Sequence, residues 1–118
     1  MSYLFIVLSY LIGSINFAYL VAKYKKLDIS SSGSGNPGTS NVMRTIGKKY
    51  AAIVLIGDVL KGFLPILLFS ENMLICGFAA VIGHIYPIFY KFKGGKGVAT
   101  YIGVYIAFST LNPISYDL

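Results

Sequence analysis

Four long apolar runs limit the folds open to this chain, which has 118 residues, 56% of them hydrophobic. The runs cover residues 3–22, 50–69, 73–90 and 97–113. Each approaches the ~20 residues that a helix needs to cross a bilayer, where unpaired backbone groups are too costly for other structures. The sequence therefore predicts an all-α integral membrane protein, with four transmembrane helices in a single membrane domain over residues 1–118.

The basic residues lie between these runs, and only Lys61 falls within one. The formal net charge is +6, and nine of the 10 Lys and Arg residues follow the first or the third run. The turn after the second run carries Glu71 instead. Cytoplasmic loops of membrane proteins have such an excess of positive charge. We therefore expect both basic loops in the cytoplasm and both termini outside. Because the charge flanks membrane segments, we expect membrane lipids and no nucleic acid as partners.

Both basic loops are also rich in glycine. The first contains Gly-Ser-Gly-Asn-Pro-Gly-Thr-Ser-Asn at 33–41 and then Arg44, and the second contains Lys-Phe-Lys-Gly-Gly-Lys-Gly-Val-Ala-Thr at 91–100. Glycine lets backbone N–H groups approach an anion closely, and Lys and Arg supply positive charge. We predict that the two loops meet at the membrane edge and bind phosphate groups.

Three ionisable residues lie within the apolar runs: Asp58, Lys61 and His84. Asp58 and Lys61 are three residues apart, so they share a helix face and can pair. Ionisable groups at membrane depth face the protein interior or a polar site. A structural ion pair and a catalytic role are equally open for this pair, and a packing role and a catalytic role are equally open for His84. No Cys/His cluster has metal-ligand spacing, so we expect no metal and no cofactor.

Small residues recur at every fourth position from just before the last run and through it. These are Gly95, Ala99, Gly103 and Ala107. Small residues at this spacing let two helix backbones approach closely. The pattern therefore predicts that another helix packs against this face.

The glycine-rich motifs resemble those of the bacterial acyl-phosphate:glycerol-3-phosphate acyltransferases. The resemblance covers Gly33–Arg44, Gly83–Thr100 and the segment Asp-Val-Leu-Lys-Gly at 58–62. It implies an enzyme of the bacterial cell (inner) membrane that takes part in phospholipid biosynthesis. Such an enzyme transfers a fatty acyl group from acyl phosphate to the 1-hydroxyl of glycerol 3-phosphate, giving lysophosphatidic acid and phosphate. Where family members commonly read Ala-Thr-Asn, this chain has Thr39-Ser40-Asn41.

The resemblance also implies roles for individual residues. Those implied to bind the phosphate-bearing substrates are Ser34, Asn36, Asn41, Arg44, Lys91, Lys93, Gly94, Gly95, Lys96 and Gly97. The proton of the attacking hydroxyl needs an acceptor, and His84, Asp58 and a substrate phosphate oxygen are the alternatives. Ser34 is a further catalytic candidate.

The resemblance covers only the amino-terminal portion of that family. Its members have seven helices and a third motif with a His and an Asn, which the sequence read here does not contain. We therefore expect a missing carboxy-terminal segment or a second copy to complete an active enzyme. One alternative is a truncated, inactive remnant that binds anionic lipid or phosphate. Another is a small four-helix transporter, which the lack of an acidic residue in the first run disfavours.

Overall fold

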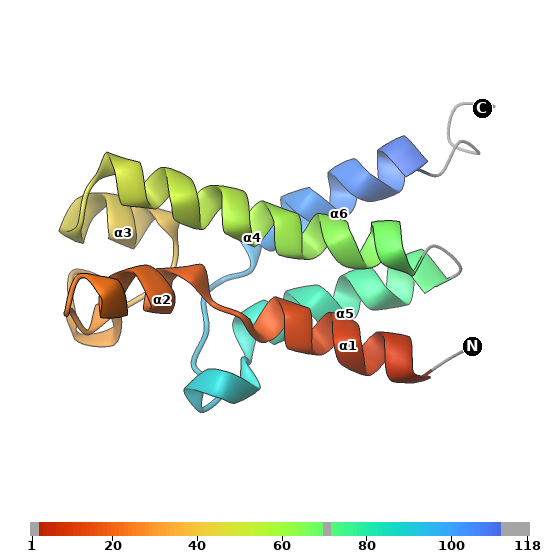
Figure 1. Ribbon diagram of the computed structural model, residues 1–118, viewed down its shortest axis with the longest axis horizontal. Helices are drawn as coiled ribbons and strands as arrows, with labels where there is room; N and C mark the ends of the chain where they lie inside the picture. Colours follow the sequence, from red (N-terminus) through yellow and green to blue (C-terminus); the bar gives the residue numbers. More distant parts are fainter. Residues whose placement is uncertain (1–2, 70–71, 112–118) are drawn as a thin grey trace.

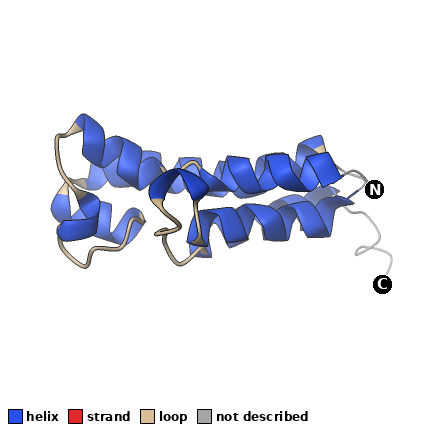
Figure 2. Ribbon diagram, turned by 90° about the horizontal axis from the view of Figure 1, so that it is seen from below, coloured by secondary structure: helices blue, strands red, loops and turns tan. Residues whose placement is uncertain are grey.

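The computed structural model describes residues 3–69 and 72–111, and these contain only helices and connecting loops (Figure 2). The prediction of an all-α membrane protein is confirmed. The α-helices are α1 (Tyr3–Ser14), α2 (Phe17–Tyr24), α3 (Thr39–Thr45), α4 (Lys48–Leu68), α5 (Met73–Ile85) and α6 (Val98–Leu111). Short 3-10 helices cover Ile29–Ser31 (η1) and Ile88–Tyr90 (η3). Glu71 and the last part of the predicted fourth span lie outside the described residues.

The longest helix, α4, runs from one end of the molecule to the other and organises the rest (Figure 1). Its second half lies in a bundle with α1, α5 and α6, and its first half packs against α2 and α3. The first glycine-rich loop lies at the α2–α3 end. The second leaves α5 through η3 and returns to the middle of the molecule, where α6 begins. The elements that carry the two loops are therefore neighbours.

Close glycine contacts hold the bundle together. A Cβ atom on Gly13 of α1 would overlap the carbonyl oxygen of Ala80 in α5. A Cβ on Gly103 of α6 would likewise overlap the carbonyl oxygen of Val59 in α4, and one on Gly62 would overlap that of Thr100. The predicted close packing along the small-residue face of the last run is confirmed at Gly103, and the partner helix is α4.

The first apolar run is interrupted, which corrects the expectation of one continuous helix over residues 3–22. The helix stops at Ser14 and a new one starts at Phe17. Asn16 causes this restart, because its side-chain oxygen accepts a hydrogen bond from the Tyr19 N–H (3.0 Å) and so caps α2. Asparagine is among the residues that most favour this capping position. The hydropathy of the run is unaffected by the break, so hydropathy did not reveal it.

Within residues 3–69 and 72–111, three segments are long and apolar enough to cross a membrane: Tyr3–Tyr24, Lys48–Leu68 and Met73–Tyr90. The third consists of α5 and η3 rather than one helix. In α6 the described helix has 14 residues, which is about 21 Å at 1.5 Å per residue and less than the ~30 Å hydrocarbon core. The count of four transmembrane helices therefore stays a prediction.

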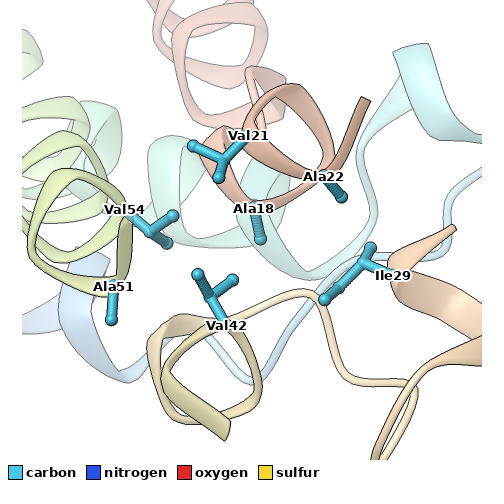
Figure 3. Close-up of a cluster of buried hydrophobic side chains, with 7 residues drawn as sticks. All are labelled: Ala18, Val21, Ala22, Ile29, Val42, Ala51 and Val54. Carbon is cyan, nitrogen blue, oxygen red and sulfur yellow. The ribbon is translucent and has the colours of Figure 1, made fainter. Parts of the chain in front are cut away.

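An apolar cluster fixes the first loop against the rest of the molecule. Figure 3 shows its side chains converging from α2, η1, α3 and α4. The cluster consists of Ala18, Val21, Ala22, Ile29, Val42, Ala51 and Val54. Val42 is fully buried in it and lies two residues before Arg44 on α3. Burial of Val42 therefore sets where α3 carries Arg44.

Candidate phosphate-binding site

The first glycine-rich loop is shaped by Asn41, a residue that is 2% exposed. Its side-chain oxygen accepts a hydrogen bond from the Ser34 N–H (3.0 Å), and its side-chain amide donates to the Ser32 carbonyl oxygen (2.9 Å). Gly33 and Gly35 have φ values of 55° and 77°, which glycine adopts without steric cost. Asn41 therefore holds the loop in a tight curve, and its amide group is occupied within the protein.

The second loop is tied to the end of α5. The Gly94 N–H donates to the Ile85 carbonyl oxygen (3.0 Å), and the Gly95 N–H donates to the His84 carbonyl oxygen (3.2 Å). The glycine content of this loop predicted that its N–H groups bind an anion, but those of Gly94 and Gly95 donate to backbone oxygens within the protein. The Tyr19 hydroxyl also donates to the Lys93 carbonyl oxygen (2.8 Å), which attaches the loop to α2.

A cavity of about 470 Å³ lies between the two loops, α4, α5 and the start of α6. Eight of the residues proposed from the sequence line it: Ser34, Asn36, Asn41, Arg44, Asp58, His84, Lys96 and Gly97. Four others do not line it: Lys91, Lys93, Gly94 and Gly95. Gly94 and Gly95 are hydrogen-bonded to the end of α5, whereas Lys91 and Lys93 are exposed. Ser34 and Lys96, which are 62 positions apart in the sequence, thus line the same cavity.

Asp58 and His84 line this cavity with buried polar side chains, which are 2% and 4% exposed. The Lys61 ammonium lies 3.2 Å from Asp58 Oδ1, which confirms that these two residues pair. The His84 Nδ1 atom lies 3.9 Å from the same carboxylate oxygen, beyond hydrogen-bond distance. The structure thus places an ion pair and an imidazole behind the loops, on α4 and α5.

The positive charges at the cavity mouth come from two different loops. Arg44 projects from α3 and Lys96 precedes α6, and both side chains are exposed. The first turn of α6, Val98 and Ala99, also lines the cavity. The unpaired N–H groups of a helix start attract anions, as do Arg and Lys side chains. The mouth is therefore suited to phosphate groups, while the interior offers groups that can accept a proton.

Sequence reasoning missed several lining residues, including Thr39, Leu55 and Ile102. The Thr39 Oγ1 atom is buried and has no hydrogen-bond partner among the described residues. Its position within the first glycine-rich motif was the signal that could have found it. Leu55 and Ile102 lie on apolar helix faces, where nothing in the sequence distinguishes a residue that lines a cavity from one that faces lipid.

The fold and the site together define a multi-pass helical membrane protein with a cationic cavity between two glycine-rich loops. The glycerol-3-phosphate acyltransferase family model matches residues 3–116, and the chain belongs to this family. A glycerol-3-phosphate acyltransferase of Aquifex aeolicus is 47% identical over 88% of this chain and 58% of its own length. The homologue from Ruthia magnifica is 51% identical over 94% of this chain and 60% of its own.

Two crystal structures of PlsY (YgiH), an integral membrane glycerol 3-phosphate acyltransferase, have the same fold. The glycerol 3-phosphate form superposes with a TM-score of 0.85 and 45% identity, over 92% of this chain and 57% of that one. The lysophosphatidic acid form gives a TM-score of 0.81 over the same shares. The chain therefore spans a little under three fifths of the length of these relatives.

Proposed function

We propose that this chain binds glycerol 3-phosphate and acyl phosphate in the cavity between its loops and takes part in acyl transfer between them. The observation that carries the proposal is that Arg44 and Lys96 line the same cavity as the buried Asp58 and His84 side chains. Both substrates bear phosphate, and one carries a lipid tail, so a cationic cavity among membrane helices fits both. The function of the named relatives supports the same reaction.

The proposed reaction requires the protein to orient the two substrates and does not require a covalent enzyme intermediate. The 1-hydroxyl oxygen of glycerol 3-phosphate attacks the acyl carbonyl carbon, a new C–O bond forms, and the bond to phosphate breaks. The hydroxyl proton passes to an acceptor, for which His84, Asp58 and a phosphate oxygen remain the alternatives. Arg44 and Lys96 reduce the repulsion between two anionic substrates held close together. The Ser34 and Asn36 side chains lie at the same mouth, where they can hydrogen-bond to phosphate or glycerol oxygens.

Replacing either mouth cation by alanine should weaken substrate binding. A charge-assisted hydrogen bond contributes about 1.5–3 kcal/mol, so we expect Arg44→Ala and Lys96→Ala each to lower affinity for glycerol 3-phosphate by about 10-fold to 100-fold. Calorimetric titration of the detergent-solubilised chain measures this. Lys48→Ala is the matched control, because Lys48 is exposed and does not line the cavity.

The same preparations test the reaction itself. Radiolabelled glycerol 3-phosphate and acyl phosphate are supplied to the chain alone, and to the chain together with the carboxy-terminal part of the Aquifex aeolicus relative. We expect lysophosphatidic acid to form when both parts are present and to fall with Arg44→Ala. Binding without any transfer in either preparation would contradict the enzymatic proposal and would leave a phosphate-binding protein.

We further propose that both basic loops face the cytoplasm of a bacterial inner membrane, because the excess of Lys and Arg in them follows the positive-inside rule. Single cysteines at Ser31 and Lys93, in a Cys76→Ala background, should react with an impermeant reagent only from the cytoplasmic side. A cysteine at Asn72 should react only from outside. Lys93 is a suitable position because its side chain is exposed. Labelling of Lys93→Cys from outside would reverse the orientation.

A further inference from the structure

Lys61 is buried and does not line the cavity. It nevertheless contacts Asp58, which does line the cavity, and the backbone between α1 and α2. Its ammonium donates a hydrogen bond to the Ile15 carbonyl oxygen (2.8 Å) and pairs with Asp58 Oδ1 (3.2 Å). Lys61 is 2% exposed, and a buried ammonium is costly unless such partners compensate for lost water. The Lys61 ammonium is therefore expected to hold the Ile15 carbonyl and the Asp58 carboxylate in place around it.

The Ile15 carbonyl is available to Lys61 because the first apolar run is broken there. In a continuous helix this oxygen would accept a hydrogen bond from the Tyr19 N–H, four residues later. That N–H is instead bound by the Asn16 side-chain oxygen (3.0 Å). The Leu20 N–H donates to the Asn16 backbone oxygen (3.2 Å), so α2 begins a new series of helical hydrogen bonds. Lys61 thus replaces the missing backbone donor and joins the break to α4.

The break is connected to both loops as well. The Asn16 side-chain amide donates to the Pro37 carbonyl oxygen in the first loop (3.4 Å). A Cβ atom on Gly95 of the second loop would lie 3.2 Å from that same oxygen and 2.6 Å from His84 Nε2. His84 in turn faces Asp58, the partner of Lys61, across 3.9 Å. The break is therefore bound to the first loop, the second loop lies close to Pro37 and His84, and Lys61 is linked to His84 through Asp58.

We propose that Lys61 is a positioning residue of the candidate site. It fixes the Asp58 carboxylate beside the His84 imidazole and holds the break at Ile15, so that His84 faces the cavity in one orientation. The Asp58 carboxylate oxygen is 3.9 Å from Nδ1, too far for a hydrogen bond. Its negative charge still favours the tautomer that carries a proton on Nδ1, which leaves Nε2 as an acceptor. The catalytic part of this inference rests on the proposed function, whereas the orientation of His84 does not.

The single histidine of this chain makes the orientation directly measurable. A sample labelled with ¹⁵N-histidine gives the ring-nitrogen resonances of His84 alone, and these report its tautomer. We expect Lys61→Met, which keeps the length and removes the charge, to shift both resonances. Lys61→Arg should restore them, because it retains a cation with several donors. Lys48→Met, an exposed position on the same helix, should leave them unchanged.

Lys61→Met leaves Asp58 as an uncompensated buried charge, and loss of one partner of a buried pair is strongly destabilising. The double variant Lys61→Met/Asp58→Asn removes both charges and is expected to fold. Its His84 resonances should still differ from those of the native chain, because no carboxylate faces the imidazole. Native resonances in the double variant, or in a folded Lys61→Met, would overturn the proposal.

Kinetics provide a second test when the chain, supplied with the carboxy-terminal part of the Aquifex aeolicus relative (the complemented enzyme), is active. Because Lys61 lies outside the cavity lining, Lys61→Met should lower kcat by about 100-fold through misplacement of the reacting groups and leave KM for glycerol 3-phosphate unchanged. Arg44→Ala should raise KM instead. A KM increase with native kcat in Lys61→Met would overturn the positioning role. Absence of transfer by the native protein would contradict the proposed function alone, since the resonance test does not need turnover.

Discussion

Replacing Gly103 by alanine is expected to force α6 away from α4 and to lower the stability of the protein by about 3 kcal/mol, the upper part of the usual range for overpacking. The added Cβ would overlap the Val59 carbonyl oxygen, and neighbouring Val59 and Phe63 atoms are backbone rather than flexible side-chain ends. The two helices can relieve the overlap only by moving apart, which also exposes the buried surface of Val104 and Ala107.

Thermal unfolding in detergent, followed by circular dichroism, measures this effect. Ile106→Leu is the matched control, because Ile106 is on the same helix and is 44% exposed. Gly62→Ala should have a similar effect, since its Cβ would overlap the Thr100 carbonyl oxygen across the same contact. The double variant Gly62→Ala/Gly103→Ala should lose less stability than the two single variants together, because one separation of α4 from α6 relieves both overlaps. A native melting temperature for Gly103→Ala would show that α4 and α6 are not in this close contact.

Gly95→Ala is expected to lower the rate of acyl transfer by about 100-fold, as a displacement of about 1 Å at a reacting group does. The glycine content of this loop predicted that its N–H groups approach an anion, but the Gly95 N–H donates to the His84 carbonyl oxygen. The Cβ would instead lie 2.6 Å from His84 Nε2 and 3.2 Å from the Pro37 carbonyl oxygen. The imidazole must therefore move, and the two loops must separate slightly.

Two measurements follow the effect of Gly95→Ala: kcat of the complemented enzyme, and the ¹⁵N resonances of His84. Both should change, whereas affinity for glycerol 3-phosphate should fall much less than in Arg44→Ala. Phe92→Ala in the same loop is the control, because Phe92 is 56% exposed and does not line the cavity. Unchanged resonances together with native kcat would mean that the alanine fits beside His84 and that the site tolerates the change.

Much of the site was accessible from the sequence because its chemistry is concentrated in short motifs. The charged and glycine-rich character of the two loops predicted a shared anion site, and Arg44 and Lys96 do line one cavity. The spacing of Asp58 and Lys61 predicted their ion pair, because residues three apart share a helix face. Each of these inferences depends on neighbours in sequence, which local geometry brings together whatever the rest of the fold.

The roles of individual loop residues could not be predicted from the sequence. Lys91, Lys93 and Lys96 are alike in sequence, yet only Lys96 lines the cavity. Which lysine does so depends on how the loop folds back on α5 through the hydrogen bonds of Gly94 and Gly95, and on the Tyr19 hydroxyl that binds it to α2. These contacts join residues far apart in the chain, and no local pattern encodes them.

The sequence by itself determined the helical class, the membrane environment and the chemical character of the site, because hydropathy, charge and glycine content act through local physics. Only the tertiary structure decided that the first run breaks at Ile15 and Asn16 and that Lys61 supplies the donor missing there. A single asparagine in an apolar run is compatible with a continuous helix or with a capped restart. The restart is stabilised here by partners from α4 and the first loop, Lys61 and Pro37, which only the packed fold brings within reach.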